Sequence, residues 1–213
     1  MWSPITKITE KTNLLGFNAR VHVDNPLADS IFQSNLSLFL MKLYNPSLPL
    51  IILCIGTDRS TGDSLGPLIG TKLEAANLKN IKVFGTLEEP VHAVNLQEAI
   101  DVINLNYKEH FILAIDACLG RTESIGYISI KEGSLQPGTG VNKNLPAVGN
   151  LQIIGIVNVG GFMEYMVLQN TRLSLVMKMA NIISQGIIKE TQKLNPVETS
   201  TIEAAPATEQ LYL

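Results

Sequence analysis

The chain has 213 residues, of which 46% are apolar and only 16% are charged. This length suits one α/β domain with a full hydrophobic core and short appendages. The formal net charge is −3 and no basic cluster occurs, which argues against a nucleic-acid partner. The two cysteines, Cys54 and Cys118, form no disulfide framework and fit a reducing compartment.

The sequence gives no sign of a membrane or secretory segment. It does not begin with a charged stretch followed by an apolar one, so no signal peptide is predicted. The apolar segment 173–188 contains Lys178, Asn181, Ser184 and Gln185, which fit an amphipathic helix better than a membrane span. We therefore expect a cytoplasmic protein with no membrane partner.

Three regions are distinguished along the chain. Residues 1–44 are predicted to form an N-terminal extension that packs on the core through one helix, at 27–44. A short strand-like alternation, at 19–23, precedes that helix. Residues 45–194 are predicted to form a single α/β domain. The tail, 195–213, has no basic residue and no apolar periodicity, so it is predicted to be disordered.

The predicted core alternates buried-type strands with helices. Strands are expected at 50–55, 81–87, 111–116, 125–130 and 150–159, and helices after Asp63, at 95–106 and at 162–193. This alternation predicts a three-layer α/β/α sandwich with a mostly parallel sheet of about five strands. The first and third strands are expected to be neighbours, and the fourth is expected at a sheet edge.

Two aspartates occupy positions typical of a ligand site in such a fold. Asp63 lies between the first strand and the following helix, and Asp116 ends the third strand. In open α/β sheets, ligands bind beyond the carboxyl ends of the strands. Two carboxylates that meet there share a proton, so one acts as base while the other acts as acid. The simpler roles are a helix cap for Asp63 and an acceptor of loop amides for Asp116, and spacing alone favours them.

Further polar side chains follow the predicted strands. His92 is a candidate proton shuttle or ligand, or else a loop residue held by its neighbours. Arg59 and Arg121 are candidates to pair with Asp58 or Asp116, or to hold a peptide carbonyl or carboxylate, against simple surface pairing. These residues are expected on the same face of the sheet as the aspartates.

Glycine-rich segments point to the same end of the sheet. The loop 131–149 is long and lacks periodicity, so it is expected to border the cleft. Its residues Gly138, Thr139 and Gly140 suggest backbone close to a ligand, or a tight turn. Gly160-Gly161 is a candidate source of free amides at a helix N-terminus. Tyr165 and Gln169, four apart on the predicted helix, are candidates to line the cleft, and Cys118 is expected to be a small buried thiol.

Three motifs resemble those of the bacterial spore germination protease, in the same order, over residues 50–160. The segment 56–67 resembles its first motif, 114–121 its second acidic motif, and 137–141 its Pro-Gly-Ser-Gly-Val loop. The first segment is also similar, almost letter for letter, to the YyaC family of sporulation proteins. The resemblance implies the phosphorylase/hydrolase-like fold of hydrogenase maturation proteases (HybD-like). It also implies that the proposed catalytic aspartates of the germination protease map onto Asp63 and Asp116.

The sequence departs from both protease families. The germination protease is much longer and carries segments that this chain lacks. Hydrogenase maturation proteases bind nickel through two acidic residues and a histidine from a later loop, whereas residues 131–161 contain no histidine. A metal would have to recruit His92 instead. We therefore expect no metal and no cofactor.

The leading interpretation is a sporulation-associated, metal-independent peptidase or amide hydrolase that uses Asp63 and Asp116 on a peptide or protein substrate. One alternative is a metal-assisted maturation endopeptidase using Asp63, Asp116 and His92. Another is a non-enzymatic sporulation factor that binds a peptide in the same cleft. A homodimer fits any of the three. The predicted substrate-binding residues are Asp58, Arg59, His92, Arg121, Gly138, Thr139, Gly140, Gly160 and Gly161.

Overall fold

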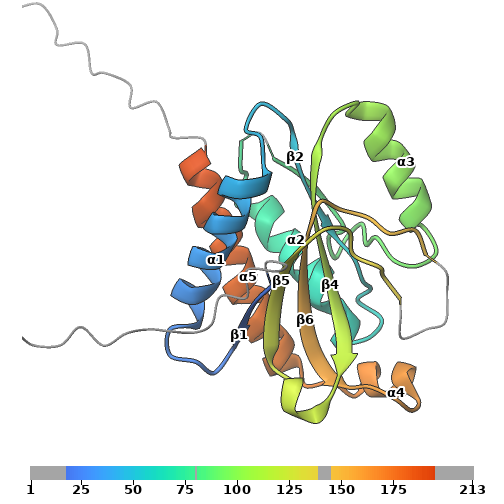
Figure 1. The fold of residues 1–213 in the computed structure, drawn as a ribbon. Coiled ribbons are helices and arrows are strands. Elements are labelled where there is room, and N and C mark those ends of the chain that lie inside the picture. Colours follow the sequence, from blue (N-terminus) through green and yellow to red (C-terminus); the bar gives the residue numbers. More distant parts are fainter. Residues whose placement is uncertain (1–17, 80, 139–144, 195–213) are drawn as a thin grey trace, which may run out of the picture.

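The computed structural model describes residues 18–79, 81–138 and 145–194. These residues form a six-stranded sheet in the order β1-β5-β6-β4-β2-β3 (Figure 1). The strands are β1 (Asn18–His22), β2 (Leu50–Cys54), β3 (Ile81–Phe84), β4 (Phe111–Gly120), β5 (Tyr127–Glu132) and β6 (Leu151–Val159). The helices are α1 (Ala28–Leu43), α2 (Leu65–Ala75), α3 (Leu96–Asn106), α4 (Glu164–Gln169) and α5 (Leu173–Leu194).

The centre of the sheet is parallel. Strand β2 pairs in parallel with β3 on one side and with β4 on the other, and β4 pairs in parallel with β6. The register of β2 and β4 runs from Leu50 opposite Phe111 to Cys54 opposite Ile115. The expected adjacency of the first and third predicted strands is therefore confirmed, and their carboxyl ends lie at the same edge of the sheet.

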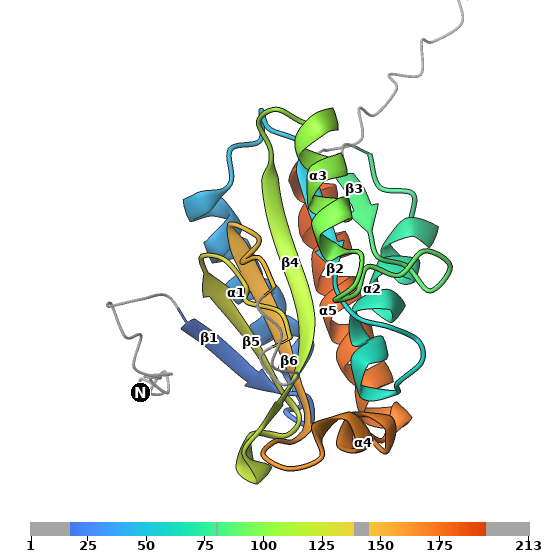
Figure 2. The ribbon, with the colours of Figure 1, turned by 90° about the vertical axis from the view of Figure 1, so that its right-hand side faces the viewer.

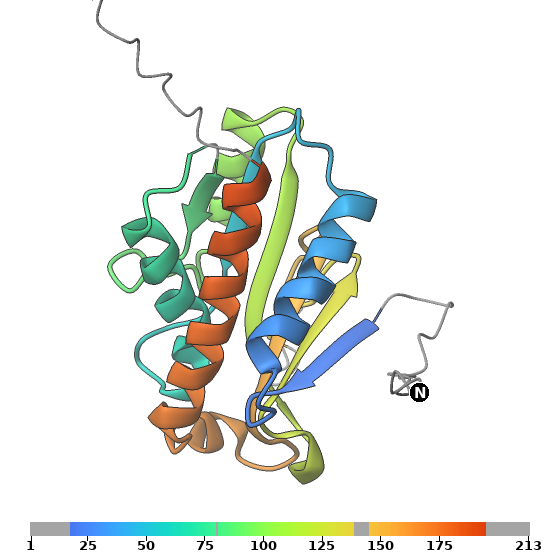
Figure 3. The ribbon, with the colours of Figure 1, turned by 90° about the vertical axis from the view of Figure 1, so that its left-hand side faces the viewer.

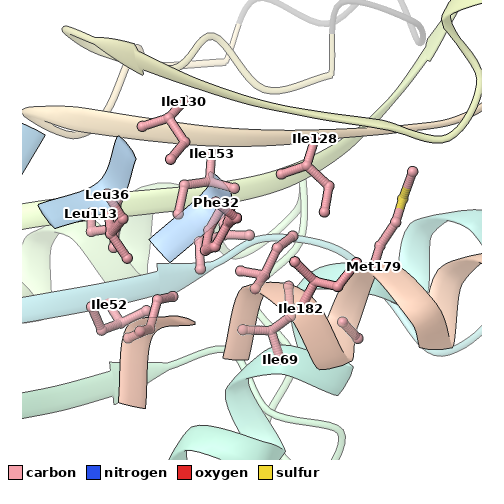
Figure 4. Close-up of a cluster of buried hydrophobic side chains, with 14 of the residues drawn as sticks. Phe32, Leu36, Ile52, Ile69, Leu113, Ile128, Ile130, Ile153, Met179 and Ile182 are labelled. Carbon is pink, nitrogen blue, oxygen red and sulfur yellow. The ribbon is translucent and has the colours of Figure 1, made fainter. Parts of the chain in front are cut away.

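Helices cover both faces of the sheet. All five residues of β2 are buried, so its side chains alternate between two hydrophobic layers. One layer joins Ile52 to side chains such as Phe32 of α1, Ile69 of α2 and Met179 of α5 (Figure 4). Figure 3 shows α1 and α5 in front of that face.

The opposite layer is smaller and is covered by α3, which lies in front of the sheet in Figure 2. Leu96 and Ile103 of α3 are fully buried against Ile51 and Leu53 of β2. The two layers confirm the predicted α/β/α sandwich with a mostly parallel sheet.

The sheet has six strands because β1 joins it. Strand β1 pairs antiparallel with β5, from Asn18 opposite Lys131 to His22 opposite Tyr127. The prediction that this strand lies at the sheet edge is therefore wrong, because β1 lies outside it. Strand β5 in turn pairs antiparallel with β6. The short alternation at 19–23 forms this edge strand, and the predicted tail, 195–213, lies outside the described residues.

Strand β4 is longer than predicted. It continues beyond Asp116 to Gly120 because β6 runs beside it, pairing Ile154 with Asp116 and Val159 with Gly120. Strand β2 stops at Cys54, opposite Ile115. Asp116 therefore lies within its own strand, but one residue past the end of the neighbouring β2.

The helix predicted at 162–193 is two helices. Helix α4 ends at Gln169 and α5 begins at Leu173. The Thr171 hydroxyl and the Asn158 side-chain amide both donate to the Val167 carbonyl, at 2.9 and 3.3 Å. These bonds satisfy a carbonyl at the end of α4 and allow the chain to turn there.

Within the described residues, no helix is both long enough and apolar enough to cross a bilayer.

Candidate active site

A cavity of about 560 Å³ lies at the carboxyl ends of β2 and β4. Its walls come from the loop after β2, the segment before α3, the second half of β4, residues 135–138, and α4. Both predicted catalytic aspartates, Asp63 and Asp116, line it. The structure thus brings together two acids that lie 53 residues apart in the sequence.

Asp63 is positioned by a short 3₁₀ turn, Gly62–Ser64, directly before α2. The Thr57 amide donates to the backbone carbonyl of Asp63 at 3.1 Å, which closes the loop after β2. A side chain on Gly56, whose φ is +143°, would collide with that carbonyl. The glycine that ends the first motif is therefore required by the close approach of the chain to Asp63.

The helix that follows is held equally close to the sheet. A Cβ atom at Gly66 would collide with the carbonyl of Ile55, just past the end of β2. Helix α2 has Ser64 at its N-cap position and no side-chain capping hydrogen bond. The Asp63 carboxyl does not cap α2, so the simpler role considered for it is not the one it has.

Asp116 is a half-buried residue of β4 whose carboxyl is held in place locally. Its Oδ1 accepts a hydrogen bond from the Ala117 amide at 2.8 Å. Burial raises the pKa of Asp116 well above its ordinary value of 3.8, and the negative charge of Asp63 raises it further. The Ala117 amide opposes both effects. At a given pH, Asp116 therefore holds its proton more readily than an isolated aspartate does.

Asp63 has the less perturbed carboxyl of the two. Burial raises its pKa above 3.8, while the Thr57 backbone amide and a positive His92 lower it. The pKa of both carboxyls is therefore raised, and that of Asp116 is raised further. The charge on Asp63 adds to the effect of burial at Asp116, whereas the Thr57 amide and a positive His92 offset burial at Asp63. Two carboxyls tuned apart in this way can serve as base and acid.

His92 lines the same cavity from the segment before α3. Its backbone amide donates to Asn95 Oδ1 at 2.8 Å, and its Nδ1 accepts from the Val94 amide at 3.3 Å. The Gly56 amide donates to the neighbouring Val91 carbonyl at 2.8 Å, which ties this segment to the first motif. These contacts fix the ring through Nδ1.

The described residues contain no group of three or more His, Cys, Asp or Glu side chains arranged to hold a metal ion. Asp63, Asp116 and His92 share a cavity, but they do not form such a group.

The predicted binding residues divide into three groups. Arg59, His92 and Gly138 line the cavity, as do Leu135 and Leu145 of the predicted bordering loop. Asp58, Arg121, Gly160 and Gly161 are exposed and lie off its lining. Thr139 and Gly140 lie outside the described residues.

The two glycines have amides that are already bonded. The Gly160 amide donates to the Gly120 carbonyl at 2.8 Å, which extends the pairing of β4 and β6. The Gly161 amide donates to Glu164 Oε1 at 3.1 Å. Neither amide is free to bind a ligand in this conformation.

Cys118 is found on the cavity wall rather than in the core, where it was expected. The residue is half-buried, and burial together with the charge of Asp116 raises the pKa of its thiol to about 11. Lys131 and Arg20 oppose this shift. A thiol with so high a pKa stays protonated at neutral pH and is a poor nucleophile.

Several lining residues escaped prediction from the sequence. Ser60 is one of them and is only 6% exposed. Its buried hydroxyl has no hydrogen-bond partner among the described residues. Tyr165 lines the cavity as expected, Gln169 does not, and Glu164 was missed. Glu164, an acid at the start of α4, could have been singled out from the sequence as a lining residue. The apolar lining residues could not, because apolar residues in strands ordinarily indicate a buried core.

The fold and the sequence relate this chain to known proteins. The solved [NiFe] hydrogenase maturation protease HycI from Thermococcus kodakarensis KOD1 superimposes with a TM-score of 0.50, at 14% identity, over 72% of this chain and 99% of that one. A hydrogenase 3 maturation protease superimposes with a TM-score of 0.40, at 15% identity, over 66% of this chain and 90% of that one. The likeness to HycI shows that the chain has a hydrogenase maturation protease-like fold.

The sequence comparison defines the family. Residues 20–186 match the family described as "Protein of unknown function (DUF1256)". The chain is 50% identical over 186 residues to YyaC of Bacillus subtilis (strain 168), covering 84% of this chain and 89% of that protein. The chain belongs to this family, and the resemblance to YyaC read from the first motif is confirmed.

Proposed function

We propose that this protein is an aspartate-dyad peptidase or amide hydrolase that needs no metal and acts on a peptide or protein in the cytoplasm of a sporulating cell. The observation that carries the proposal is that Asp63 and Asp116 line one cavity and that the charge of Asp63 raises the pKa of Asp116. The resemblance of the first motif to sporulation proteins supplies the cellular context. The likeness of the fold to HycI, itself a maturation protease, supports a peptide bond as the target.

The difference between the two carboxyls assigns their roles. Asp63, with the Thr57 amide and His92 favouring its ionised form, is the base. It removes a proton from water as the water oxygen attacks the carbonyl carbon of the substrate amide. Protonated Asp116 donates its proton to the leaving nitrogen as the carbon–nitrogen bond breaks. A proton passing from Asp63 to Asp116 restores the starting state, so the net reaction consumes one water and yields a carboxylic acid and an amine.

The remaining polar lining supports the substrate. Arg59 is exposed and lines the cavity, where its guanidinium can hold a carbonyl or carboxylate of the peptide. The buried Ser60 hydroxyl has an unused hydrogen-bonding capacity in the same wall. A positive charge on His92 lowers the pKa of Asp63 and so favours the ionised form of the base.

The proposal is tested with a proteome-derived peptide library. The protein is incubated with the library, and new amino termini are identified by mass spectrometry. We expect cleavage by the unmodified chain and at least about a hundredfold slower cleavage by Asp63→Asn and by Asp116→Asn. The matched control is Asp58→Asn, because Asp58 is exposed and lies off the cavity lining.

Two results would contradict the proposal. Cleavage that persists in both substituted proteins would show that the carboxyls are not the acid and base. Binding of peptides without any cleavage by the unmodified chain would favour the alternative of a non-enzymatic sporulation factor that uses the same cavity.

A further inference from the structure

Large apolar side chains gather beside the cavity and remain exposed to solvent. Phe162, Met163, Tyr165 and Met166 are 82%, 55%, 62% and 48% exposed. They belong to α4 and the turn before it, which Figure 1 shows beyond the carboxyl ends of β4 and β6. Scattered apolar residues are normal on a protein surface, but a cluster of large ones next to a cavity is typical of a binding surface. We call these four residues the apolar rim.

The apolar rim is continuous with the cavity. Tyr165 belongs to both, because it is mostly exposed and also lines the cavity. Glu164 and Leu168 of α4 line the cavity beside it. On another wall, Val94 also lines the cavity and is 82% exposed. A ligand that reaches the aspartates can therefore contact the apolar rim at the same time.

The backbone turns sharply just before α4, where the Met163 carbonyl accepts hydrogen bonds from the Met166 and Val167 amides at 2.8 and 3.1 Å and so begins the helix. Met163 has a left-handed backbone, with φ 49° and ψ 44°, which costs a residue with a side chain about 1 kcal/mol. The side chain of Met163 and that of its neighbour Phe162 are nevertheless exposed rather than buried. Here the strained turn presents two large apolar side chains to solvent.

The interior of the cavity is also largely apolar. Apart from the aspartates and a few polar groups, its walls include Leu119, Leu135, Leu145, Ile154 and Leu168. A ligand that fills this space gains most by presenting apolar side chains. Residues 159–169 contain one acid, Glu164, and no lysine or arginine, so the rim offers nothing to attract an anionic membrane. A polypeptide with apolar side chains is the partner that fits both rim and cavity.

We propose that the apolar rim and the apolar walls of the cavity bind an extended polypeptide segment with at least two large apolar side chains. The rim binds one side chain and the cavity walls bind another, so that the intervening amide lies near Asp63 and Asp116. This inference rests on the proposed function for the fate of the amide, but the binding itself requires no cleavage. It names the substrate class: apolar segments of the kind exposed in an unfolded chain or a flexible terminus.

The test uses two short, acetylated and amidated peptides that differ only at their centre, Leu-Phe-Met in one and Ser-Asn-Gln in the other. Binding is measured by calorimetry on the Asp63→Asn, Asp116→Asn double variant, which cannot cleave by the proposed mechanism. Alkylation of Cys118 by iodoacetamide is a second readout, because Cys118 lines the cavity whereas Cys54 is fully buried. We expect the apolar peptide to bind and to slow alkylation, and the polar peptide to do neither.

The contribution of the rim is measured by combining Phe162→Ser with Met166→Ser in that background. We expect about tenfold weaker binding of the apolar peptide, because two contact surfaces are removed. The matched control combines Met41→Ser with Leu105→Ser. These side chains are 81% and 82% exposed on α1 and α3 and lie off the cavity lining, so binding should be unchanged.

Equal binding of both peptides, or equal loss in the rim and control variants, would overturn the inference. So would a rim substitution that abolishes self-association in sedimentation while peptide binding persists, since the occupant of the rim would then be a second copy of the chain. Cleavage assays on the unmodified chain keep the two proposals apart. If the peptide binds through the rim but is never cleaved, the result supports the rim as a binding surface and contradicts the proposed peptidase activity. If cleavage occurs and does not depend on the rim, the result supports the peptidase activity and contradicts the role of the rim.

Discussion

The negative charge of Asp63 adds to the effect of burial in raising the pKa of Asp116, although one residue precedes a helix and the other lies within a strand. This relationship depends on two features of the backbone. Gly56 lets the loop after β2 approach Asp63 closely, and the pairing of β2 with β4 brings Asp116 one residue past the end of β2. Both carboxyls line the same cavity because the sheet places consecutive motifs side by side.

The first prediction concerns stability as a function of pH. A carboxyl whose pKa is raised on folding binds its proton more tightly in the folded state. Stability therefore falls as pH rises from the unfolded pKa, near 3.8 for Asp116, through the higher folded pKa. Asparagine has no charge to bury. We expect Asp116→Asn to raise the free energy of unfolding at neutral pH by about 1 kcal/mol, a usual size for one substitution.

Denaturant unfolding of both proteins between pH 4 and pH 8 checks this prediction, since the advantage of the variant should shrink as the pH approaches the unfolded pKa, near 3.8. A variant that is less stable than the unmodified chain at neutral pH would mean that ionised Asp116 is stabilised by its surroundings. Asp58→Asn is the control, because Asp58 is exposed.

The second prediction tests the close packing of α2 on the sheet. Alanine is ordinarily favoured over glycine within a helix by about 1 kcal/mol. At Gly70, however, an added Cβ would collide with the carbonyl of Gly85, just after β3. We expect Gly70→Ala to destabilise the protein by about 1–3 kcal/mol, as overpacking does. Chemical denaturation measures this, and Ser34→Ala, at an exposed site of α1, should be nearly neutral.

The sequence predicts the layers well where local signals suffice. The buried run of β2 and the periodicity of α1 and α3 are encoded in adjacent residues, and their predicted bounds agree closely with the structure. The lengths of β4 and α4 are not encoded locally. Strand β4 extends past Asp116 because β6 offers partners, and the chain breaks after Gln169 where Asn158 and Thr171 bond to Val167.

The residues of the candidate site likewise divide into those with a local sequence signal and those without one. The two aspartates were found because the residues around them form recognisable motifs. Gly160-Gly161 was chosen because glycines before a helix often expose their amides, yet here Gly120 and Glu164 accept them. A glycine pair has the same sequence whether its amides are free or already hydrogen-bonded within the protein, so the sequence does not distinguish the two cases. Of the apolar rim, Tyr165 was singled out from the sequence, but Phe162, Met163 and Met166 were missed because phenylalanine and methionine at helical spacing ordinarily indicate a buried face.

The third prediction uses the two cysteines. The pKa of Cys118 is raised to about 11, so only a small fraction is thiolate at neutral pH. We expect alkylation by iodoacetamide to be slow and to accelerate about tenfold per pH unit up to that pKa, because the thiolate is the reactive form. Cys54 is fully buried and should react only after unfolding. Mass spectrometry of the labelled chain identifies the site, and Cys118→Ser should abolish labelling of the folded protein.

The pH dependence distinguishes this interpretation from a catalytic cysteine. Rapid labelling at neutral pH, or a rate independent of pH below 9, would show an activated thiolate on the cavity wall and would contradict the assignment of the chemistry to the aspartates.

The last prediction is that the protein needs no transition metal to fold or to act. Zinc and nickel sites in proteins draw mainly on imidazole and thiolate ligands. The cavity offers one imidazole, His92, and the thiol of Cys118, whose raised pKa opposes the ionised form that a metal requires. The described residues show no grouping of such donors. We expect little zinc or nickel in protein purified without a chelator, and the same melting temperature with and without one. A near-stoichiometric metal that is lost together with several degrees of stability on chelation, and that is also lost in His92→Ala, would instead establish the metal-assisted endopeptidase.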